Sequence, residues 1–134
     1  MAAKALIFGG GKIGRGFLGH LLFRSGYQLT FVDSSPALVS LLRARGGYTV
    51  SVLGAPAKDT LVTGVHALTS ADDAAVTAAI SEHDLFVCAV GGANLPAVGQ
   101  LLGLGLAARW RAGRHTPANV IICENFQDPA AILR

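Results

Sequence analysis

The amino-acid sequence predicts an α/β domain in which helices cover both faces of a doubly wound, mostly parallel sheet. Short continuous apolar runs alternate along the chain with segments of helical apolar spacing, and a glycine-rich turn follows the first run. Parallel strands are covered on both faces, so they appear in a sequence as continuous apolar runs. The composition agrees, with 51% hydrophobic and 14% charged residues, and a length of 134 residues fits one compact domain. We therefore expect residues 1–134 to form a single domain.

The first two strands and helices have recognisable boundaries. Gly26 stands where a helix C-terminal cap is expected, and Ser34-Ser35-Pro36 combines an N-cap with proline at the first helical position. The predicted elements are, in order, a strand over 5–8, a helix from Lys12 to Ser25, a strand over 29–32 ending at Asp33, and a helix from Pro36 to about Arg45.

Residues 48–69 predict a small β-hairpin-like insertion. Residues 48–53 alternate between apolar and polar, residues 61–68 do so more loosely, and Gly54-Ala55-Pro56 makes a turn between them. Ser70 and Asp73 then have the spacing of a capping box, and Asp72 also favours a helix start, so a helix should begin here. The later elements are expected as that helix to about His83, a strand over 85–90, a helix from about Leu95 to Arg111, a strand over 120–123 and a helix starting at Asp128-Pro129. Because this last helix has barely begun at Arg134, we expect more protein beyond it.

The glycine turn has the spacing Gly9-x-Gly11-x-x-Gly14 between a strand and a helix, which is the context of a Rossmann-type dinucleotide-binding fingerprint. Gly9 permits the tight turn, Gly11 lets the backbone approach a pyrophosphate, and Gly14 lets the helix pack on the strand. The anion would lie on the N–H groups at the start of the helix. The residues expected to contact the cofactor here are Phe8, Gly9, Gly10, Gly11, Lys12, Ile13 and Gly14.

Asp33 ends the second strand about 20 residues after the fingerprint, where a carboxylate can accept hydrogen bonds from the adenosine ribose. Its charge would repel a 2′-phosphate, and Ser34 and Ser35 supply no arginine to offset this, so NAD is favoured over NADP. An ordinary turn or cap role for Asp33 is the alternative. FAD and S-adenosylmethionine proteins use similar glycine turns.

Two further strand ends should face the same crevice, because ligands of open α/β sheets bind at the carboxyl ends of the strands. Val90, Gly91 and Gly92 follow one strand, and their backbone can line the nicotinamide side. Glu124 and Asn125 follow the last strand, where a helix cap or a turn pair is the alternative interpretation.

Several classes of protein are disfavoured. The net charge of +3 comes from dispersed arginines, and the one cluster, at Arg109, Arg111 and Arg114, is better explained as a solvated helix end than as a nucleic-acid site. The apolar stretches are too short for a membrane span or a signal peptide, so a cytoplasmic protein without a membrane partner is expected. Cys88 and Cys123 lie in apolar runs as small buried hydrophobes, and the cysteines and histidines do not have zinc-site spacing.

The sequence offers no candidate for the general base of a hydride-transfer enzyme. The four histidines are scattered, Lys12 belongs to the phosphate turn, and Lys4 and Lys58 lie away from the strand ends that should form the site. We therefore expect no catalytic residue and no metal site in this chain.

The segment from Ala5 to Phe17, with its Gly-Arg-Gly-Phe extension, and the tripeptide Cys123-Glu124-Asn125 resemble the polyol-specific long-chain dehydrogenases of the mannitol dehydrogenase family. The resemblance implies an N-terminal NAD-binding domain, oxidation of mannitol 1-phosphate to fructose 6-phosphate without a metal, and a helical C-terminal domain beyond Arg134 that carries a lysine base with nearby asparagine and histidine. It also implies a ribose contact at Asp33 and an active-site contact at Asn125. One departure is Gly10, where alanine is usual.

Two other functions remain open on the sequence. The chain could be a stand-alone module that senses NAD and turns nothing over. It could also be the cofactor domain of another polyol or sugar-acid dehydrogenase, because the expected contacts to the polyol phosphate lie mostly in the other domain.

Overall fold

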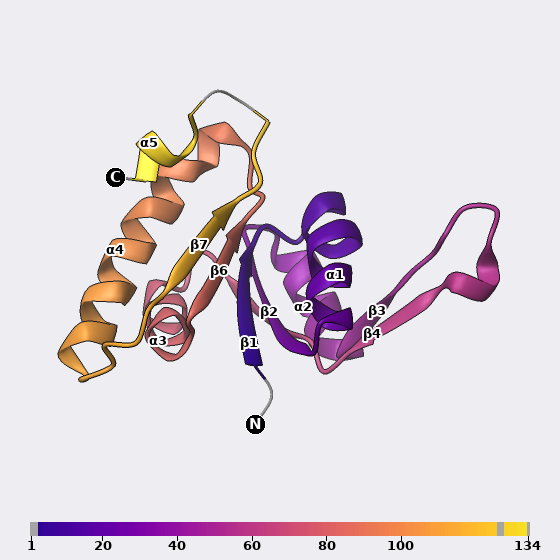
Figure 1. The fold of residues 1–134 in the computed structure, drawn as a ribbon, viewed down its shortest axis with the longest axis horizontal. Coiled ribbons are helices and arrows are strands. Elements are labelled where there is room, and N and C mark those ends of the chain that lie inside the picture. Colours follow the sequence, from indigo (N-terminus) through magenta and orange to yellow (C-terminus); the bar gives the residue numbers. More distant parts are fainter. Residues whose placement is uncertain (1–2, 126–127, 134) are drawn as a thin grey trace.

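The computed structural model describes residues 3–125 and 128–133, and its centre is a five-stranded sheet in which every described strand pair is parallel. The strand order is β5-β2-β1-β6-β7 (Figure 1). The chain starts in the middle, steps outward in one direction and then returns to step outward in the other, so the predicted doubly wound fold is confirmed. The strands are β1 (Ala3–Phe8), β2 (Tyr27–Asp33), β5 (His66–Thr69), β6 (Leu85–Cys88) and β7 (Asn119–Ile122).

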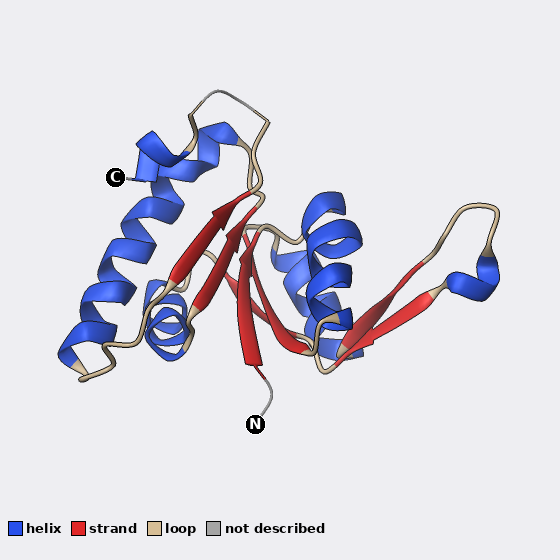
Figure 2. Ribbon diagram, viewed as in Figure 1, coloured by secondary structure: helices blue, strands red, loops and turns tan. Residues whose placement is uncertain are grey.

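Helices lie on both sides of this sheet (Figure 2). One side carries α1 (His20–Arg24), which continues a preceding π-helical segment η1 (Gly14–Gly19), and α2 (Pro36–Arg45). The other side carries α3 (Asp73–Glu82) and α4 (Leu95–Arg111), and the short α5 (Ala130–Leu133) packs against α4. No helix among the described residues is long and apolar enough to span a bilayer.

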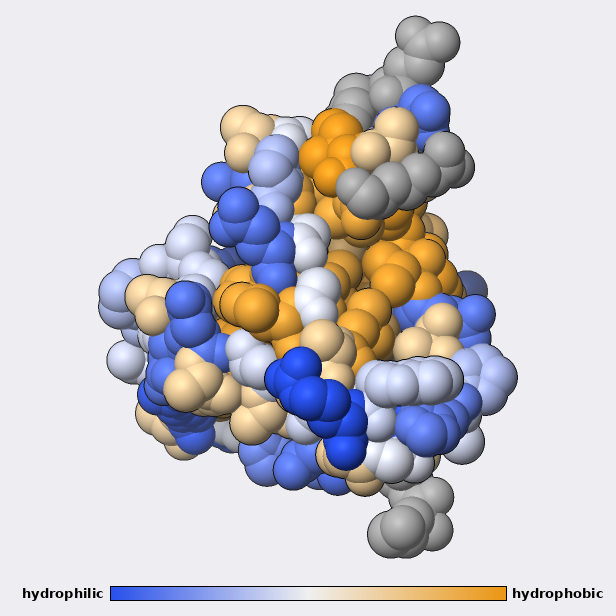
Figure 3. Space-filling view, turned by 90° about the vertical axis from the view of Figure 1, so that its left-hand side faces the viewer, coloured by the Kyte–Doolittle hydropathy of each residue, from blue (hydrophilic) through white to orange (hydrophobic). Residues whose placement is uncertain are grey.

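The side chains of β1 alternate between two hydrophobic cores, as the two-residue period of a strand requires. Ala5 and Ile7 belong to the core beneath α1 and α2, whereas Leu6 and Phe8 belong to the core beneath α3 and α4. All four are at most 1% exposed. Hydrophobic residues also gather at the centre of the outer face that carries α4 (Figure 3).

The predicted caps of the first half are confirmed. The hydroxyl of Ser35 accepts a hydrogen bond from the Leu38 N–H at 3.3 Å, and Pro36 opens α2. Gly26, the predicted C-terminal cap, follows α1 with a φ of +91°. The structure adds a cap at Gly46, which ends α2 with a φ of +64°. In the second half the cap is Asp72, which accepts from the Ala75 N–H, and not Ser70 as the capping-box spacing predicted.

The hairpin insertion in the structure is shorter than the predicted range of residues 48–69. Strands β3 (Gly47–Val50) and β4 (Thr60–Thr63) pair antiparallel and project from the body, with the 3₁₀ turn η2 (Pro56–Lys58) in their loop (Figure 1). Residues 66–69, expected as the end of the hairpin, instead form the edge strand β5 of the main sheet. Gly64 separates the two strands, because its φ of +65° breaks the extended backbone.

The helix after the glycine turn departs from regular α geometry. Residues 14–19 form a π-helical segment, where the apolar spacing predicted an α-helix. Glycine at position 19 permits the close packing that results: a Cβ there would collide with the Tyr48 hydroxyl and lie 2.9 Å from the Gly14 carbonyl oxygen. That hydroxyl donates a hydrogen bond to the Arg15 carbonyl oxygen at 2.7 Å, which ties the hairpin to this helix.

Candidate dinucleotide-binding site

A cavity of about 420 Å³ opens at the carboxyl ends of β1, β2 and β6, in the size range of small-ligand sites. It lies where the chain reverses its direction of winding, which is where open α/β sheets bind ligands. Its walls are the glycine turn, the end of β2, the start of α3 and one side of α4. The lining residues are Phe8, Gly9, Gly11, Val32, Asp33, Ser34, Ser70, Asp73, Ala89, Val90, Asn94, Ala97, Val98, Gln100, Leu101 and Leu104.

The three fingerprint glycines have different surroundings. Gly9 has a φ of +101°, and a Cβ there would overlap the carbonyl group of Ala89. A Cβ at Gly14 would overlap the carbonyl oxygen of Gly9. Gly11 lines the cavity, and a Cβ there would meet no described atom within 4 Å. Internal packing therefore requires glycine at positions 9 and 14, whereas glycine at position 11 keeps the cavity wall open.

The Asp33 carboxylate is held rigidly at the cavity wall. One oxygen accepts the Gly10 N–H and the other accepts the Ser35 N–H, both at 2.8 Å. Each oxygen keeps a free lone pair, so the carboxylate can still accept hydrogen bonds from a ligand. Among the described residues the cavity lining contains no lysine or arginine.

Glu124 has a role that sequence reasoning missed. Its two carboxylate oxygens accept the N–H groups of Val90 and Gly91 at 2.8 and 3.1 Å. The pairing of Cys88 with Ile122 in parallel β6 and β7 sets these residues side by side. The backbone N–H groups expected to line the nicotinamide side are therefore already engaged, although the Val90 residue itself lines the cavity.

The structure brings together only some of the predicted contacts. Phe8, Gly9, Gly11, Asp33 and Val90 line one cavity, and Gly10 reaches it through its bond to Asp33. The predicted residues outside the lining are Lys12, Ile13, Gly14, Gly91 and Asn125, and of these Gly14 alone is buried. The α4 side of the cavity was not predicted, because apolar positions at helical spacing look the same whether they pack in a core or line a site.

In the described part of the cavity lining, the titratable side chains are the carboxylates of Asp33 and Asp73. Among the described residues the lining has no histidine, lysine, tyrosine or cysteine. Burial, assisted by the negative charge of Glu124, raises the pKa of the nearby Cys88 thiol to about 12, so it stays protonated. Cys88 is buried as predicted, but Cys123 is only partly buried. Within 3–125 and 128–133, no group of three or more histidines, cysteines or carboxylates could hold a metal ion.

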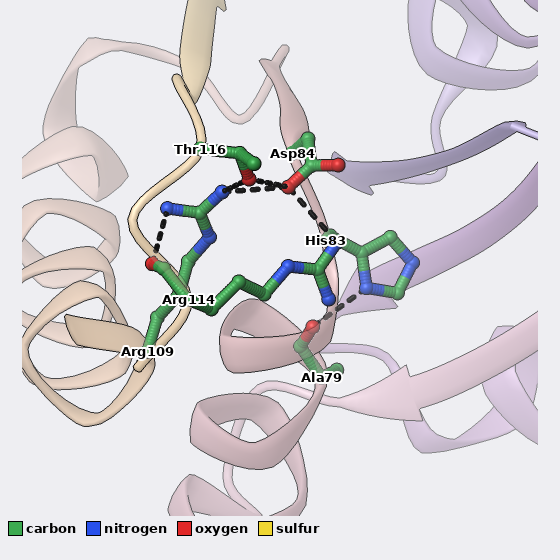
Figure 4. Close-up of polar contacts among 6 residues, drawn as sticks. All are labelled: Ala79, His83, Asp84, Arg109, Arg114 and Thr116. Carbon is green, nitrogen blue, oxygen red and sulfur yellow. Dashed lines mark hydrogen bonds and ion pairs between the residues drawn. The ribbon is translucent and has the colours of Figure 1, made fainter. Parts of the chain in front are cut away.

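A second polar cluster lies at the opposite end of β6 (Figure 4). Arg109 is 5% exposed, so the prediction of a solvated helix end was wrong for this residue. Its guanidinium contacts the Asp84 carboxylate at 2.6 Å and also donates to Thr116, while Arg114 reaches the same Asp84 oxygen at 2.9 Å. The pKa of Asp84 lies below its ordinary value, chiefly because Arg109 donates a hydrogen bond to its carboxylate. This cluster joins α4 and the start of β7 to β6.

A buried histidine adjoins this cluster. His83 is 6% exposed, and its Nδ1 donates to the Ala79 carbonyl oxygen at 2.6 Å. Burial lowers the pKa of His83, so its ring is neutral near pH 7. His83 and Asp84 lie just before β6, at the end of this strand opposite the cavity, and their contacts stabilise the fold.

Solved structures with a similar fold include one that is described as NAD(P)-binding. The TrkA-N domain of the inner membrane protein ybaL from Escherichia coli matches with a TM-score of 0.63 and 19% identity, over 99% of this chain and 81% of that chain. A Rossmann-fold NAD(P)-binding family protein from Shigella flexneri matches with a TM-score of 0.56 and 15% identity, over 98% and 57%. Saccharopine dehydrogenase from Saccharomyces cerevisiae matches with 0.54 and 12%, over 98% and 24%. This chain therefore corresponds to only part of the latter two proteins.

The family described as the mannitol dehydrogenase Rossmann domain matches residues 3–134. The open cavity wall at Gly11 and the carboxylate at the end of β2 fit the dinucleotide that this fold binds. The fold and the family together support a nicotinamide cofactor and a dehydrogenase as the parent protein. By this match over nearly its whole length, the chain belongs to the mannitol dehydrogenase family, as its Rossmann domain.

Proposed function

We propose that this chain is the NAD-binding domain of a mannitol-1-phosphate 5-dehydrogenase. The observation that carries the NAD assignment is the Asp33 carboxylate, fixed at the cavity wall by the N–H groups of Gly10 and Ser35. A ribose with two free hydroxyls offers this acceptor two donors, whereas a 2′-phosphate would bring a second negative charge next to it. A cavity lining without lysine or arginine among its described residues offers nothing to offset that repulsion.

The position of each lining residue on the sheet indicates which part of the cofactor it would contact. The turn from Gly9 to Gly14 and the start of the following helix would hold the pyrophosphate, because the first N–H groups of a helix lack intrahelical acceptors. Asp33, at the end of β2, would hold the adenosine ribose. The β6 side, with Val90, would face the nicotinamide. When bound, the nicotinamide supplies the hydride acceptor for oxidation of an alcohol carbon to a ketone.

The substrate part of the proposal rests on sequence resemblance. Arg15-Gly16-Phe17 after the fingerprint and Cys123-Glu124-Asn125 after β7 resemble the polyol-phosphate enzymes of the family. Mannitol 1-phosphate would lose a hydride from C5 to the cofactor and its hydroxyl proton to a lysine of a helical domain beyond Arg134. Asn125, exposed at the carboxyl edge of β7, is available to contact substrate there.

Calorimetric titration tests the cofactor assignment. The wild-type chain should bind NADH more tightly than NADPH, and Asp33→Ala should weaken NADH binding about tenfold or more, because hydrogen bonds to a charged acceptor are lost. Asp59→Ala is the matched control, since Asp59 also accepts a backbone N–H, from Val52, but lies in the hairpin loop. Unchanged NADH affinity in Asp33→Ala would remove Asp33 from the ribose role, and a wild-type chain that binds no NADH would contradict the proposal.

A binding module without catalysis is the second candidate, and it is consistent with a described cavity lining that holds two carboxylates, Asp33 and Asp73, but no histidine, lysine, tyrosine or cysteine. The two functions differ in turnover. The gene product is mixed with NAD and mannitol 1-phosphate, free mannitol or a sugar acid, and NADH formation is followed by absorbance. Formation of NADH only with mannitol 1-phosphate supports the first proposal. Formation of NADH with one of the other substrates identifies a different dehydrogenase. Tight NADH binding without turnover of any of these substrates supports the binding module.

A further inference from the structure

Glu124 is placed beside the loop between β6 and α4 by the register of the sheet. β6 and β7 are parallel, Cys88 pairs with Ile122, and the Cys123 N–H donates to the Cys88 carbonyl oxygen at 2.8 Å. Two residues beyond the last paired position of each strand, Glu124 therefore lies level with Val90. The two oxygens of its carboxylate accept the Val90 and Gly91 N–H groups.

The loop that Glu124 holds has a defined but unusual backbone. Gly91 has a φ of +85°, and Asn94 donates from its side chain to the Val90 carbonyl oxygen at 2.9 Å. The Asn94 N–H also reaches the Gly91 carbonyl oxygen at 3.1 Å. Asn94 thus satisfies the loop carbonyls, and Glu124 satisfies the loop N–H groups. Without Glu124 the Val90 and Gly91 donors would lose the acceptor that fixes them.

This loop lies on one particular side of the cavity. Ala89, Val90 and Asn94 line it from the loop after β6, whereas Asp33 lines it from the end of β2, and the glycine turn after β1 lies between them. A dinucleotide whose pyrophosphate lies on the turn and whose adenosine ribose meets Asp33 must extend its other half toward β6. The loop held by Glu124 therefore borders the nicotinamide half.

We propose that Glu124 is a positioning residue for the nicotinamide half of the site. Its carboxylate fixes the backbone of Val90 and Gly91 and, through the chain itself, anchors the adjacent Asn125 at the same edge. This inference rests on the proposed cofactor function. It adds a role for the central residue of the Cys-Glu-Asn tripeptide, which acts through the loop and not by touching the reacting atoms.

The test compares two ligands that differ only at the nicotinamide end. NADH and ADP-ribose are titrated calorimetrically into wild-type chain, Glu124→Gln and Glu124→Asp. Glutamine presents an NH₂ group to one loop donor, and aspartate is one methylene too short to reach both. Each variant should weaken NADH binding about tenfold, because a charge-assisted bond to a backbone donor is lost, and should change ADP-ribose affinity by less than about twofold. Glu82→Gln, at an exposed position of α3, is the matched control.

Amide hydrogen exchange without ligand provides a second readout. Exchange at Val90 and Gly91 should be faster in Glu124→Gln than in wild type, while exchange at Gly10, whose N–H is bonded to Asp33, should not change. Equal losses of NADH and ADP-ribose affinity, or full NADH affinity in both variants, would overturn the inference. Equal affinity of the wild-type chain for the two ligands would also overturn it, whereas a wild-type chain that binds neither would overturn the proposed function instead.

Discussion

Gly9 and Gly11 lie in the same turn, but glycine is required at the two positions for different reasons. Alanine substitutions should distinguish a requirement for packing at Gly9 from a requirement for ligand access at Gly11. Gly9→Ala would place a Cβ against the Ala89 carbonyl group at a φ of +101°, so we expect the free energy of unfolding to fall by about 2–4 kcal/mol. Gly11→Ala would place a Cβ in open space, so we expect a change within about 0.5 kcal/mol. Urea denaturation measures both.

Gly11→Ala should impair binding of the ligand although it leaves the fold stable. Gly11→Ala keeps the fold but puts a methyl group into the cavity wall, and we expect it to abolish most NADH binding in a calorimetric titration. Gly113→Ala is a control for the backbone strain in Gly9→Ala, because Gly113 has a φ of +81° with no described atom within 4 Å of a Cβ. Unimpaired NADH binding by Gly11→Ala would mean that the pyrophosphate does not approach this turn.

Asp84 should make the stability of the fold sensitive to acid. Its pKa is held below the ordinary value of 3.8, chiefly by the hydrogen bond from Arg109. A carboxylate with a lowered folded-state pKa stabilises the fold fully above pH 3.8, and this contribution is lost as the pH falls through the folded-state pKa. The free energy of unfolding from urea titrations at pH 7 and pH 3 should therefore fall more steeply in wild type than in Asp84→Asn. Parallel declines in the two proteins would show that Arg109 and Asp84 are not coupled.

At the scale of elements, local signals predicted most of the fold. Ser35, Pro36 and Gly46 each act within one helical turn, so the sequence could place α2 correctly. The division between β4 and β5 at Gly64 was missed, because a loosely alternating run reads as one strand until its partners are known. Ser70 and Asp72 are equally good caps by type, and only the three-dimensional path of the chain decides between them.

In the candidate site, too, the sequence predicted the residues with local signals and missed the contacts between distant positions. Gly9, Gly11 and Asp33 carry their signal in spacing along the chain, and all three line the cavity. The carboxylate of Glu124 meets Val90 across 34 positions, a contact that depends on the β6–β7 register. Arg109 looked like a surface residue for the same reason, since its partner Asp84 is 25 positions away. Contacts of this range follow from sheet pairing, which a single sequence does not specify.

The hairpin should contribute to stability through Tyr48. Its hydroxyl donates to the Arg15 carbonyl oxygen at 2.7 Å, and burial raises its pKa to about 12. Tyr48→Phe should lower the free energy of unfolding by about 1 kcal/mol near pH 7, because one part-buried hydrogen bond is lost. A raised folded-state pKa adds stability that is complete below the ordinary value of 10.0 and disappears as the pH rises toward 12.

Thermal unfolding at pH 8 and pH 11 tests this contribution. The wild-type chain should lose more stability between the two conditions than Tyr48→Phe, since the variant has no hydroxyl to ionise at that position. Tyr27→Phe, in β2, controls for the loss of a tyrosine in general. Equal alkaline losses in wild type and Tyr48→Phe would show that the Tyr48 hydroxyl is not held by the Arg15 carbonyl in solution.

At the scale of the whole molecule, two hydrophobic cores lie on opposite faces of the sheet, and the candidate cavity lies at the carboxyl ends of its strands. The cavity is lined by Gly9 and Gly11, in the turn that leads into η1 and α1 on one face, and by residues of α3 and α4 on the other face. A ligand in this cavity would contact elements that the cores do not join directly. Cofactor binding should therefore stabilise the molecule as a unit and not only the residues of the glycine turn.

Thermal unfolding in the presence of NADH or NADPH tests whether cofactor binding stabilises the whole molecule. A ligand that binds only the folded state at 100 times its Kd adds about 2.7 kcal/mol, which corresponds to roughly 8–10 °C in Tm for a domain of this size. NADPH at the same concentration should produce less than half of that shift, because its 2′-phosphate meets the Asp33 carboxylate that Gly10 and Ser35 hold in place. Asp33→Ser should narrow the difference between the two ligands by lowering the NADH shift and raising the NADPH shift. Equal shifts in the wild-type chain would mean that this carboxylate does not select the cofactor.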